Sequence, residues 1–182
     1  LLAKRLDFHN GFMFCPMVSG QDVERYEVLE NMEKKSGLDM NVVTAFEVVE
    51  RVAKPDAFIR AVRSVLASNA LFFLTTSTID GFEHQTLWEK SKNIFPPDHM
   101  TLFSINGITQ MLGRNGFNVL EVSTPGNLDI DIVMNQVSRD KDIKIPRFLD
   151  KILKSDNPEL KNDFQGFLQK NCLSSYLRIS CQ

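Results

Sequence analysis

The sequence predicts an α/β fold built on a parallel sheet, and three observations lead to this class. Residues 42–46 and 70–74 are short, nearly continuous apolar runs, which are typical of strands that are covered on both faces. Between them, residues 55–67 carry apolar side chains at helical spacing. Strand, helix and strand over about 30 residues form a βαβ unit, whose strands are expected to pair in parallel through a right-handed crossover.

The composition indicates one domain and disfavours two classes of partner. With 182 residues and 43% hydrophobic content, the chain is long enough to bury one substantial core. The net charge of −2 and the charged fraction of 24% show no basic surplus of the kind that attracts nucleic acid or an anionic membrane. No apolar segment approaches the ~18 residues that a membrane span requires. We therefore expect no nucleic-acid partner and no membrane partner.

The cysteines and the N-terminus bear on compartment and completeness. Cys15, Cys172 and Cys181 give an odd count without C-x-x-C spacing, which favours buried free thiols in a reducing compartment over disulfides or a zinc site. We expect a cytoplasmic protein. The chain begins at Leu1, without an initiating methionine and without a signal-peptide pattern, so we expect a fragment.

Local signals predict elements on both sides of the first strand. Residues 12–15 form an apolar patch that predicts a short strand. Asp22 suits the N-cap of a surface helix that ends near Lys35. In the βαβ unit, Pro55 suits the first helical position and Ser68-Asn69 is expected to end the helix near residue 67.

The segment after the βαβ unit begins irregularly and then becomes regular. Residues 79–99 show no clear period and follow the carboxyl end of a strand, so we expect a lid or substrate loop. Ser104 is the predicted N-cap of a helix over 105–114, which Asn115-Gly116 ends. Residues 117–123 alternate between apolar and polar and predict a third strand.

The C-terminal part of the chain predicts three helices and one strand. Residues 128–135 fit either strand alternation or a short helix, and we favour the helix, followed by a solvated turn at 139–142. Prolines near the start predict helices over 146–154 and 158–170. Residues 173–181 predict a final strand, antiparallel to its neighbours if it closes a sheet edge.

Five segments occur in a characteristic order: Val43-Thr-Ala-Phe-Glu-Val-Val-Glu-Arg-Val52, the Lys54-Pro55 helix, Leu74-Thr-Thr76, Pro97-Asp-His99 with Phe103-Ser104, and Asn115-Gly-Phe-Asn-Val119. In this order they resemble the back half of class I S-adenosylmethionine-dependent methyltransferases. Residues 124–133 and the tail 164–178 look like a bacterial subgroup that is often associated with surface-polysaccharide or small-metabolite modification. The resemblance covers roughly residues 38–182. It implies a Rossmann-like, seven-stranded sheet of which strands four to seven are present.

The half of this fold that binds the methyl donor is not recognisable in residues 1–40. The resemblance implies a glycine-rich turn after the first strand and an acidic residue that binds the ribose hydroxyls at the end of the second. No G-x-G occurs in the chain, and about 40 residues cannot hold three strands with their connecting helices. We therefore expect a degenerate or truncated segment at 1–40, a C-terminal half at 41–182, and a sheet that is incomplete at its N-terminal half.

A second departure concerns metal binding. The family commonly reads Glu-x-x-Glu-His where this chain has Glu47-Val-Val-Glu50-Arg51. In relatives that act on catechol-like hydroxyls, the two carboxylates and the histidine look to hold a divalent metal. A guanidinium stays protonated and offers no lone pair, so Arg51 cannot be a ligand. We expect an ion pair between this arginine and the carboxylates, and no metal.

The candidate site residues follow the carboxyl end of the first strand. Glu47 and Glu50 stand where ligands bind in open α/β sheets, although two solvated loop carboxylates are the alternative. On the resemblance, Phe46 and Glu47 lie beside S-adenosylmethionine, and His99 and Glu50 face the acceptor. A neutral His99 suits the proton that methyl transfer releases. The alternative is a histidine that fixes its loop by hydrogen bonds to the backbone.

Other polar and aromatic residues keep two interpretations. The 79–99 segment holds three aromatic residues, Phe82, Trp88 and Phe95. They either line an acceptor pocket or pack the loop onto the core, and we favour packing. The hydroxyls of residues 75–78 either contact a ligand or satisfy loop backbone. His9 and His84 have no partner visible in the sequence, so both are expected at the surface.

The resemblance implies that the full-length parent transfers a methyl group from S-adenosylmethionine to a small metabolite or sugar. The alternative function is a non-catalytic, methyltransferase-like remnant that acts as a binding or interaction module and requires no donor loop. A third interpretation is that another subunit supplies the missing strands. It predicts an exposed apolar sheet edge beside Val42 and is compatible with a homo-oligomer.

Overall fold

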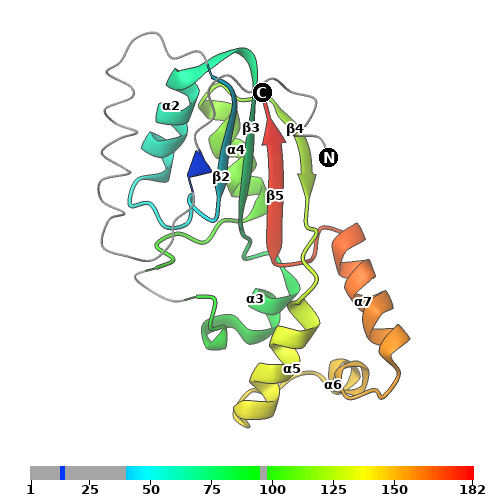
Figure 1. Ribbon diagram of the computed structural model, residues 1–182. Helices are drawn as coiled ribbons and strands as arrows, with labels where there is room; N and C mark the ends of the chain where they lie inside the picture. Colours follow the sequence, from blue (N-terminus) through cyan, green and yellow to red (C-terminus); the bar gives the residue numbers. More distant parts are fainter. Residues whose placement is uncertain (1–12, 15–39, 95–97) are drawn as a thin grey trace.

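A five-stranded sheet in the order β1-β2-β3-β5-β4 forms the centre of the computed structural model, which describes residues 13–14, 40–94 and 98–182 (Figure 1). The strands are β1 (Met13–Phe14), β2 (Met40–Phe46), β3 (Leu66–Ser77), β4 (Val119–Ser123) and β5 (Tyr176–Cys181). The pairs β1–β2 and β2–β3 are parallel, whereas β5 runs antiparallel to both β3 and β4. The predicted α/β class is confirmed.

The predicted βαβ unit is formed by β2, α2 (Pro55–Val65) and β3. Its two strands pair side by side in parallel, with Val43 opposite Phe72 and Ala45 opposite Leu74. The apolar face of α2, which includes Ile59 and Val62, is buried. Packing of this face, rather than helix propensity alone, stabilises a helix of this length.

The end of α2 differs from the prediction. The helix stops at Val65 and β3 begins at once with Leu66, so Ser68-Asn69 lies inside the strand instead of ending the helix. Asn69 has φ 63°, and the β2–β3 register shifts between Met40 and Val42. Pairing with β2 therefore recruits residues that local preference assigned to a helix end, and the left-handed residue absorbs the mismatch.

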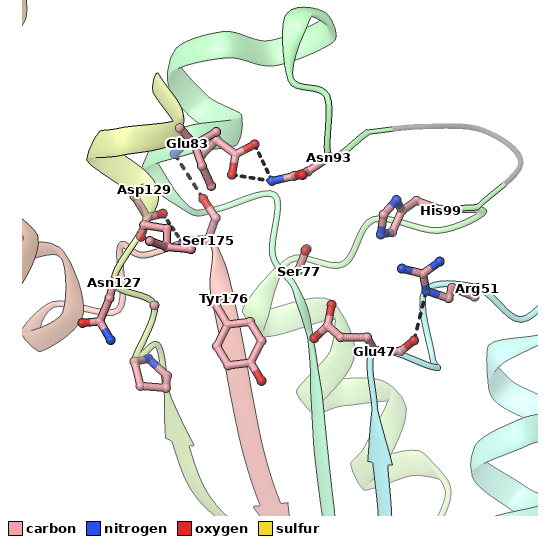
Figure 2. A pocket seen from close by; sticks show the side chains of 14 residues that line it. Glu47, Arg51, Ser77, Glu83, Asn93, His99, Asn127, Asp129, Ser175 and Tyr176 are labelled. Atoms are coloured by element: carbon pink, nitrogen blue, oxygen red, sulfur yellow. Dashed lines mark hydrogen bonds between the residues drawn. The ribbon is translucent and has the colours of Figure 1, made fainter. Parts of the chain in front are cut away.

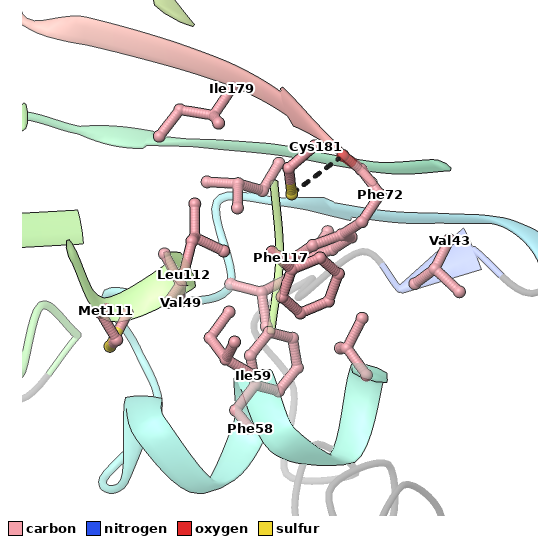
Figure 3. Close-up of a cluster of buried hydrophobic side chains, with 14 of the residues drawn as sticks. Val43, Val49, Phe58, Ile59, Phe72, Met111, Leu112, Phe117, Ile179 and Cys181 are labelled. Atoms are coloured by element: carbon pink, nitrogen blue, oxygen red, sulfur yellow. Dashed lines mark hydrogen bonds between the residues drawn. The ribbon is translucent and has the colours of Figure 1, made fainter. Parts of the chain in front are cut away.

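The first hydrophobic core lies between the sheet and two helices, α2 and α4 (Ile105–Arg114) (Figure 3). The ring of Phe72 from β3 lies 5.4 Å, between centroids, from the ring of Phe117, which precedes β4, and is tilted by 42° to it. Ile59 from α2 and Leu112 from α4 belong to the same buried cluster. The predicted cap of α4 is confirmed, because the Ser104 Oγ accepts the backbone N–H of residue 107 at 3.0 Å. Because α2 and α4 contribute to the same core, both helices cover one face of the sheet.

A second hydrophobic core lies beyond the carboxyl ends of β2 and β3 (Figure 1). It joins a set of short helices: α3 (Phe82–Leu87), α5 (Asp129–Arg139), α6 (Arg147–Leu153) and α7 (Pro158–Lys170). Buried Leu87, Val133 and Leu168 connect three of them. The prediction of an irregular 79–99 segment is wrong in part, since it holds α3 and the 3-10 turn η1 (Trp88–Lys90). The favoured helix at 128–135 is confirmed and continues through residue 139.

The C-terminal strand has an unexpected place in the sheet. It is antiparallel, as predicted, but it lies between β3 and β4 instead of closing an edge. Its position buries the Cys181 thiol, which lies 3.6 Å from the Phe72 carbonyl oxygen (Figure 3). Burial raises the pKa of this thiol to about 12, which makes it unreactive. The predicted buried thiol is thus confirmed at Cys181.

Some predictions concern residues that the structure does not describe or does not decide. The helix predicted from Asp22, together with His9, Cys15 and Phe95, lies outside the described residues. The third interpretation predicted an exposed apolar sheet edge beside Val42. In the structure, β1 pairs with this edge of β2 through Thr44 and Ala45, and Val42 is half-buried. In the described part of the chain, no helix is long and apolar enough to cross a membrane.

Candidate functional site

A cavity of about 470 Å³ lies where β2 and β3 end and β5 begins, below α3 and α5 (Figure 2). This is the edge of the sheet at which open α/β folds bind ligands. Its lining comes from five parts of the chain: Glu47, Arg51, Ser77, Glu83, Asn93, His99, Pro125, Gly126, Asn127, Leu128, Asp129, Ile132, Ser175 and Tyr176.

Glu47 directs its carboxylate into this cavity (Figure 2). It directly follows β2 with φ 54°, a left-handed conformation that is costly for a residue with a side chain. Its backbone N–H donates to the Thr75 carbonyl oxygen at 3.0 Å and to the Thr75 Oγ1 at 3.2 Å. Its Oε1 is buried and has no hydrogen-bond partner among the described residues. Burial raises the pKa of the carboxyl, against the lowering effects of Thr75 and Arg51.

Glu50 does not line the cavity, because its side chain is fully buried. The Thr76 Oγ1 donates to its Oε2 at 2.8 Å. Burial, followed by the charge of Glu47, raises the pKa of Glu50 to about 7. The Glu50 carbonyl oxygen accepts two further bonds, from the backbone N–H groups of Met100 at 2.8 Å and Thr101 at 3.1 Å. Glu50 therefore holds the loop that carries His99.

Arg51 forms the predicted ion pair with one of the two carboxylates. Its Nε lies 3.5 Å from the Glu50 Oε1, and its Nη1 lies 3.4 Å from the Asp98 Oδ2. It meets Glu47 through the backbone instead, since its Nε donates to the Glu47 carbonyl oxygen at 3.1 Å (Figure 2). Within the described residues, no three His, Cys, Asp or Glu side chains are grouped as metal ligands.

His99 lines the same cavity as Glu47 (Figure 2). Its Nδ1 is buried without a hydrogen-bond partner in the described part of the chain. Burial, and secondly the positive charge of Arg51, lower the pKa of the imidazole, although Asp98 opposes this. The ring is therefore neutral at pH 7 and has a nitrogen lone pair for a proton.

The model of a protein family described as a methyltransferase domain matches residues 2–122. The chain belongs to this methyltransferase family. The match confirms the resemblance, and it begins at residue 2, whereas the motifs quoted from the sequence begin near residue 38.

Two solved structures of methyltransferases are similar to this chain. A SAM-dependent methyltransferase from Archaeoglobus fulgidus is 10% identical, with a TM-score of 0.50 over 84% of this chain and 63% of that one. A putative methyltransferase from Haloferax volcanii, solved with its activator, is 16% identical, with a TM-score of 0.48 over 79% of this chain and 54% of that one. The chain thus spans less than two thirds of the length of either structure. No curated protein matches the sequence.

In the methyltransferase domain, Phe46 is the last residue of β2, at the end of the strand where the cavity lies, but it is not among the residues that line the cavity. Its ring is 41% exposed, which is unusual for a phenylalanine that ends a central strand. Of the four residues predicted to form the site, the structure therefore brings Glu47 and His99 into one cavity. It leaves Phe46 at the adjoining surface and buries Glu50 beneath the cavity.

Two buried carboxylates of the methyltransferase domain were not predicted as site residues. Glu83, at the start of α3, accepts from the Ser91 Oγ at 2.5 Å and from the Asn93 Nδ2 at 2.9 and 2.8 Å. Asp129 accepts three bonds: from the Ser174 Oγ at 2.6 Å, the Ser175 N–H at 2.7 Å and the Gln165 Nε2 at 2.9 Å. Neither residue has a local sequence signal, because their partners lie in other elements.

Several predictions about neighbouring residues are wrong. His84, expected at the surface, is fully buried, and burial lowers the pKa of its imidazole. Trp88, expected to pack, is 61% exposed. Phe82 does pack, because its ring meets that of Phe164 edge-on at 5.3 Å. In the 75–78 segment, the three threonine hydroxyls bond the protein's own groups, namely the Glu50 carboxylate and the backbone, whereas Ser77 lines the cavity.

Proposed function

We propose that this methyltransferase domain takes part in methyl transfer from S-adenosylmethionine to a small molecule, a metabolite or sugar, that binds in the cavity. The observation that carries the proposal is the juxtaposition, in a cavity at the strand ends, of a neutral His99 and a Glu47 carboxylate with an oxygen that is unpaired among the described residues. Membership of the methyltransferase family supplies the class of reaction.

The residues at the end of β2 fit the methyl donor chemically. S-adenosylmethionine, when bound, supplies a methyl group that its positive sulfonium already activates. Glu47 has a buried oxygen without a partner, and a buried charge of this kind is stabilised by an opposite charge. Phe46 offers an exposed ring that suits both apolar contact and a cation. We therefore place the donor beside these two residues, with the Glu47 carboxylate between the donor and the acceptor.

The remaining residues have the tasks that methyl transfer requires of the protein. Positioning is the largest of these, since holding two reactants in line replaces much of the entropic barrier. His99 accepts the proton that an acceptor hydroxyl or amine loses, because its pKa is lowered and Nδ1 is unpaired. Glu50, predicted to face the acceptor, acts from beneath the cavity by holding the backbone of residues 100 and 101. It is a positioning residue in this proposal.

Calorimetric titration with S-adenosylhomocysteine, the demethylated product, tests the proposal. We expect saturable, one-to-one binding by the purified chain. Phe46→Ala is expected to weaken binding about tenfold, because it removes apolar area at the donor site. Phe148→Ala is the matched control, since this ring on α6 is 77% exposed and does not line the cavity.

Two outcomes would contradict the proposal. If a chain that is folded by circular dichroism gives no heat with S-adenosylhomocysteine, the non-catalytic binding module becomes the better function. The absence of G-x-G in the sequence favours that second candidate. If both phenylalanine variants lose affinity equally, the donor does not bind at the end of β2.

A further inference from the structure

We infer that the cavity is selective for a small, positively charged ligand with an apolar body, such as an aliphatic or arylalkyl ammonium compound. The inference deepens the proposed function by naming a class of acceptor, and it rests on that function for the role of the ligand as an acceptor. In that role the ammonium group first loses a proton, to His99 in the proposed function, because its nitrogen needs a lone pair to take the methyl group. The binding preference itself rests on the charges and surfaces of the cavity.

The charges of the lining residues are unbalanced. Three carboxylates, Glu47, Glu83 and Asp129, face one basic side chain, Arg51, among the described residues that line the cavity. That guanidinium is already shared between Glu50 and the neighbouring Asp98, at 3.5 and 3.4 Å. The cavity therefore carries excess negative charge, which is poorly screened at a partly buried site.

Two of the three carboxylates are satisfied by the protein itself. Glu83 accepts three contacts and Asp129 accepts three bonds, all from protein donors, an arrangement that suits the ionised form. They contribute negative potential but no free oxygen. Glu47 is different, because its carboxylate points into the cavity (Figure 2) and its buried Oε1 has no hydrogen-bond partner within the described residues, so the protein satisfies this charge less completely. A ligand donor therefore meets Glu47.

The other unpaired polar atom at this site is also an acceptor. His99 is neutral at pH 7, since burial and Arg51 lower its pKa, and its Nδ1 has no partner among the described residues. An ammonium group offers several N–H donors together with a positive charge, so it suits the acceptor side chains of the cavity and offsets the excess negative charge. A neutral hydroxyl offers a donor without the charge. A carboxylate or phosphate meets like charges and is disfavoured.

Apolar side chains also line the cavity. Leu128 and Ile132, at the start of α5, line it together with Pro125 and the ring of Tyr176. Leu128 and Tyr176 belong to the exposed large hydrophobic residues of the protein. Figure 2 shows Tyr176 and Asn127 across the cavity from Glu47. Exposed apolar surface beside a charged group favours a ligand that carries both features.

Three probes of matched size separate charge from shape. Phenethylamine, 2-phenylethanol and phenylacetate share a phenyl ring and differ in carrying a positive, neutral or negative group. We expect calorimetry of the full chain at neutral pH to give phenethylamine an affinity at least about tenfold higher than that of 2-phenylethanol. Phenylacetate should show no saturable binding.

Glu47→Gln tests the assigned carboxylate, because it keeps the shape and removes the charge. We expect this variant to lose the preference for phenethylamine and to keep the affinity for 2-phenylethanol. Glu159→Gln, in the exposed first turn of α7, is the control and should keep the preference. Equal binding of the three probes, tighter binding of the anion, or an unchanged preference in Glu47→Gln would overturn the inference.

The acceptor class and the proposed methyl transfer can be rejected separately. Binding of S-adenosylhomocysteine without a preference for the ammonium probe would leave methyl transfer standing and reject this acceptor class. The ammonium preference without S-adenosylhomocysteine binding would support the cation site and reject methyl transfer by this chain.

Discussion

Glu50 shows how burial changes a single residue. Its carboxyl is fully buried and, among the described residues, only Thr76 donates a hydrogen bond to it, at 2.8 Å. Arg51 approaches only the other oxygen, at 3.5 Å. Because desolvation of the charged form exceeds these favourable contacts, the pKa of Glu50 rises to about 7.

This shift predicts a stability that falls as pH rises. The folded protein binds the Glu50 proton more tightly than the unfolded chain, so stability is lost as the pH rises from the ordinary glutamate pKa of 4.5 to about 7. The loss from this residue is up to about 3 kcal/mol. Glu50→Gln should remove it, because the Gln carbonyl oxygen can still accept from Thr76. Urea unfolding across this pH range measures the slope.

The control for this prediction is Glu121→Gln on the surface of β4, where the side chain is 61% exposed. It should keep the pH dependence of the unmodified chain. An identical slope in Glu50→Gln and the unmodified chain would show that the buried carboxyl does not titrate in this range.

At the scale of elements, the segment after β2 is tied to the loop that carries His99. Arg51 bonds the carbonyl oxygen of Glu47 and pairs with Asp98, next to the histidine. The Glu50 carbonyl oxygen accepts from residues 100 and 101. These contacts hold the loop over the cavity and bring a positive charge towards the imidazole.

Arg51→Met is therefore expected to raise the pKa of His99. The variant removes the repulsion between the guanidinium and a protonated ring, while burial, the larger cause of the lowered pKa, remains. NMR titration of the histidine ring protons measures the change, with His99→Gln to assign the signal. Arg60→Met, in the exposed face of α2, should leave the pKa where it is. A fall in the pKa in Arg51→Met would contradict the assigned role.

At the scale of the whole molecule, a close backbone contact between residues 78–82 and 173–175, here called the seam, joins the sheet to the helices of the second core. Gly81 lies against the backbone of Ser175 at the start of β5, and a Cβ there would stand 2.2 Å from the Ser175 Cα. Around this contact, the N–H of Thr78 donates to the Ser175 carbonyl oxygen at 2.8 Å and the N–H of Phe82 donates to the Leu173 carbonyl oxygen at 2.7 Å. The cavity lies at this seam, so its shape depends on both layers.

Gly81→Ala should thus destabilise the whole fold. The added methyl group meets backbone that cannot move aside, and we expect the free energy of unfolding to fall by at least about 2 kcal/mol. Gly166→Ala, in the middle of α7 with no atom within 4 Å of the new Cβ, should instead raise it by up to about 1 kcal/mol. Chemical denaturation of both variants tests the pair, and equal effects would argue against the seam.

Predictions from sequence succeeded where the physics is local. The start of α4, for example, follows from Ser104, whose hydroxyl accepts the backbone N–H of the residue three positions later. Predictions failed where pairing with a distant strand overrides local preference. Leu66, which was predicted to be helical, joins β3 because it pairs with Met40. His84 was assigned to the surface, yet the packing of α3 against the rest of the second core buries it.

The candidate site divides in the same way. Glu47 and His99 were predicted because strand ends and the turn that returns to them can be found in the sequence, and the structure brings both to one cavity. Glu83 and Asp129 were missed, because no helical or strand period reveals their contacts: Asp129 meets residues 36 to 46 positions away, and Glu83 meets a turn 8 and 10 positions away as well as the distant start of β5. The backbone N–H of Glu83, for example, donates to the Ser175 Oγ across 92 positions.

The sequence by itself thus determined the α/β class, most element bounds and membership of the methyltransferase family, since periodicity, caps and motifs are properties of contiguous residues. Only the tertiary structure decided that β5 inserts between β3 and β4, that Glu50 is buried while Glu47 is open to the cavity, and that negative charge exceeds positive charge there. Burial and charge balance depend on which distant groups share a small volume, and the fold alone sets that.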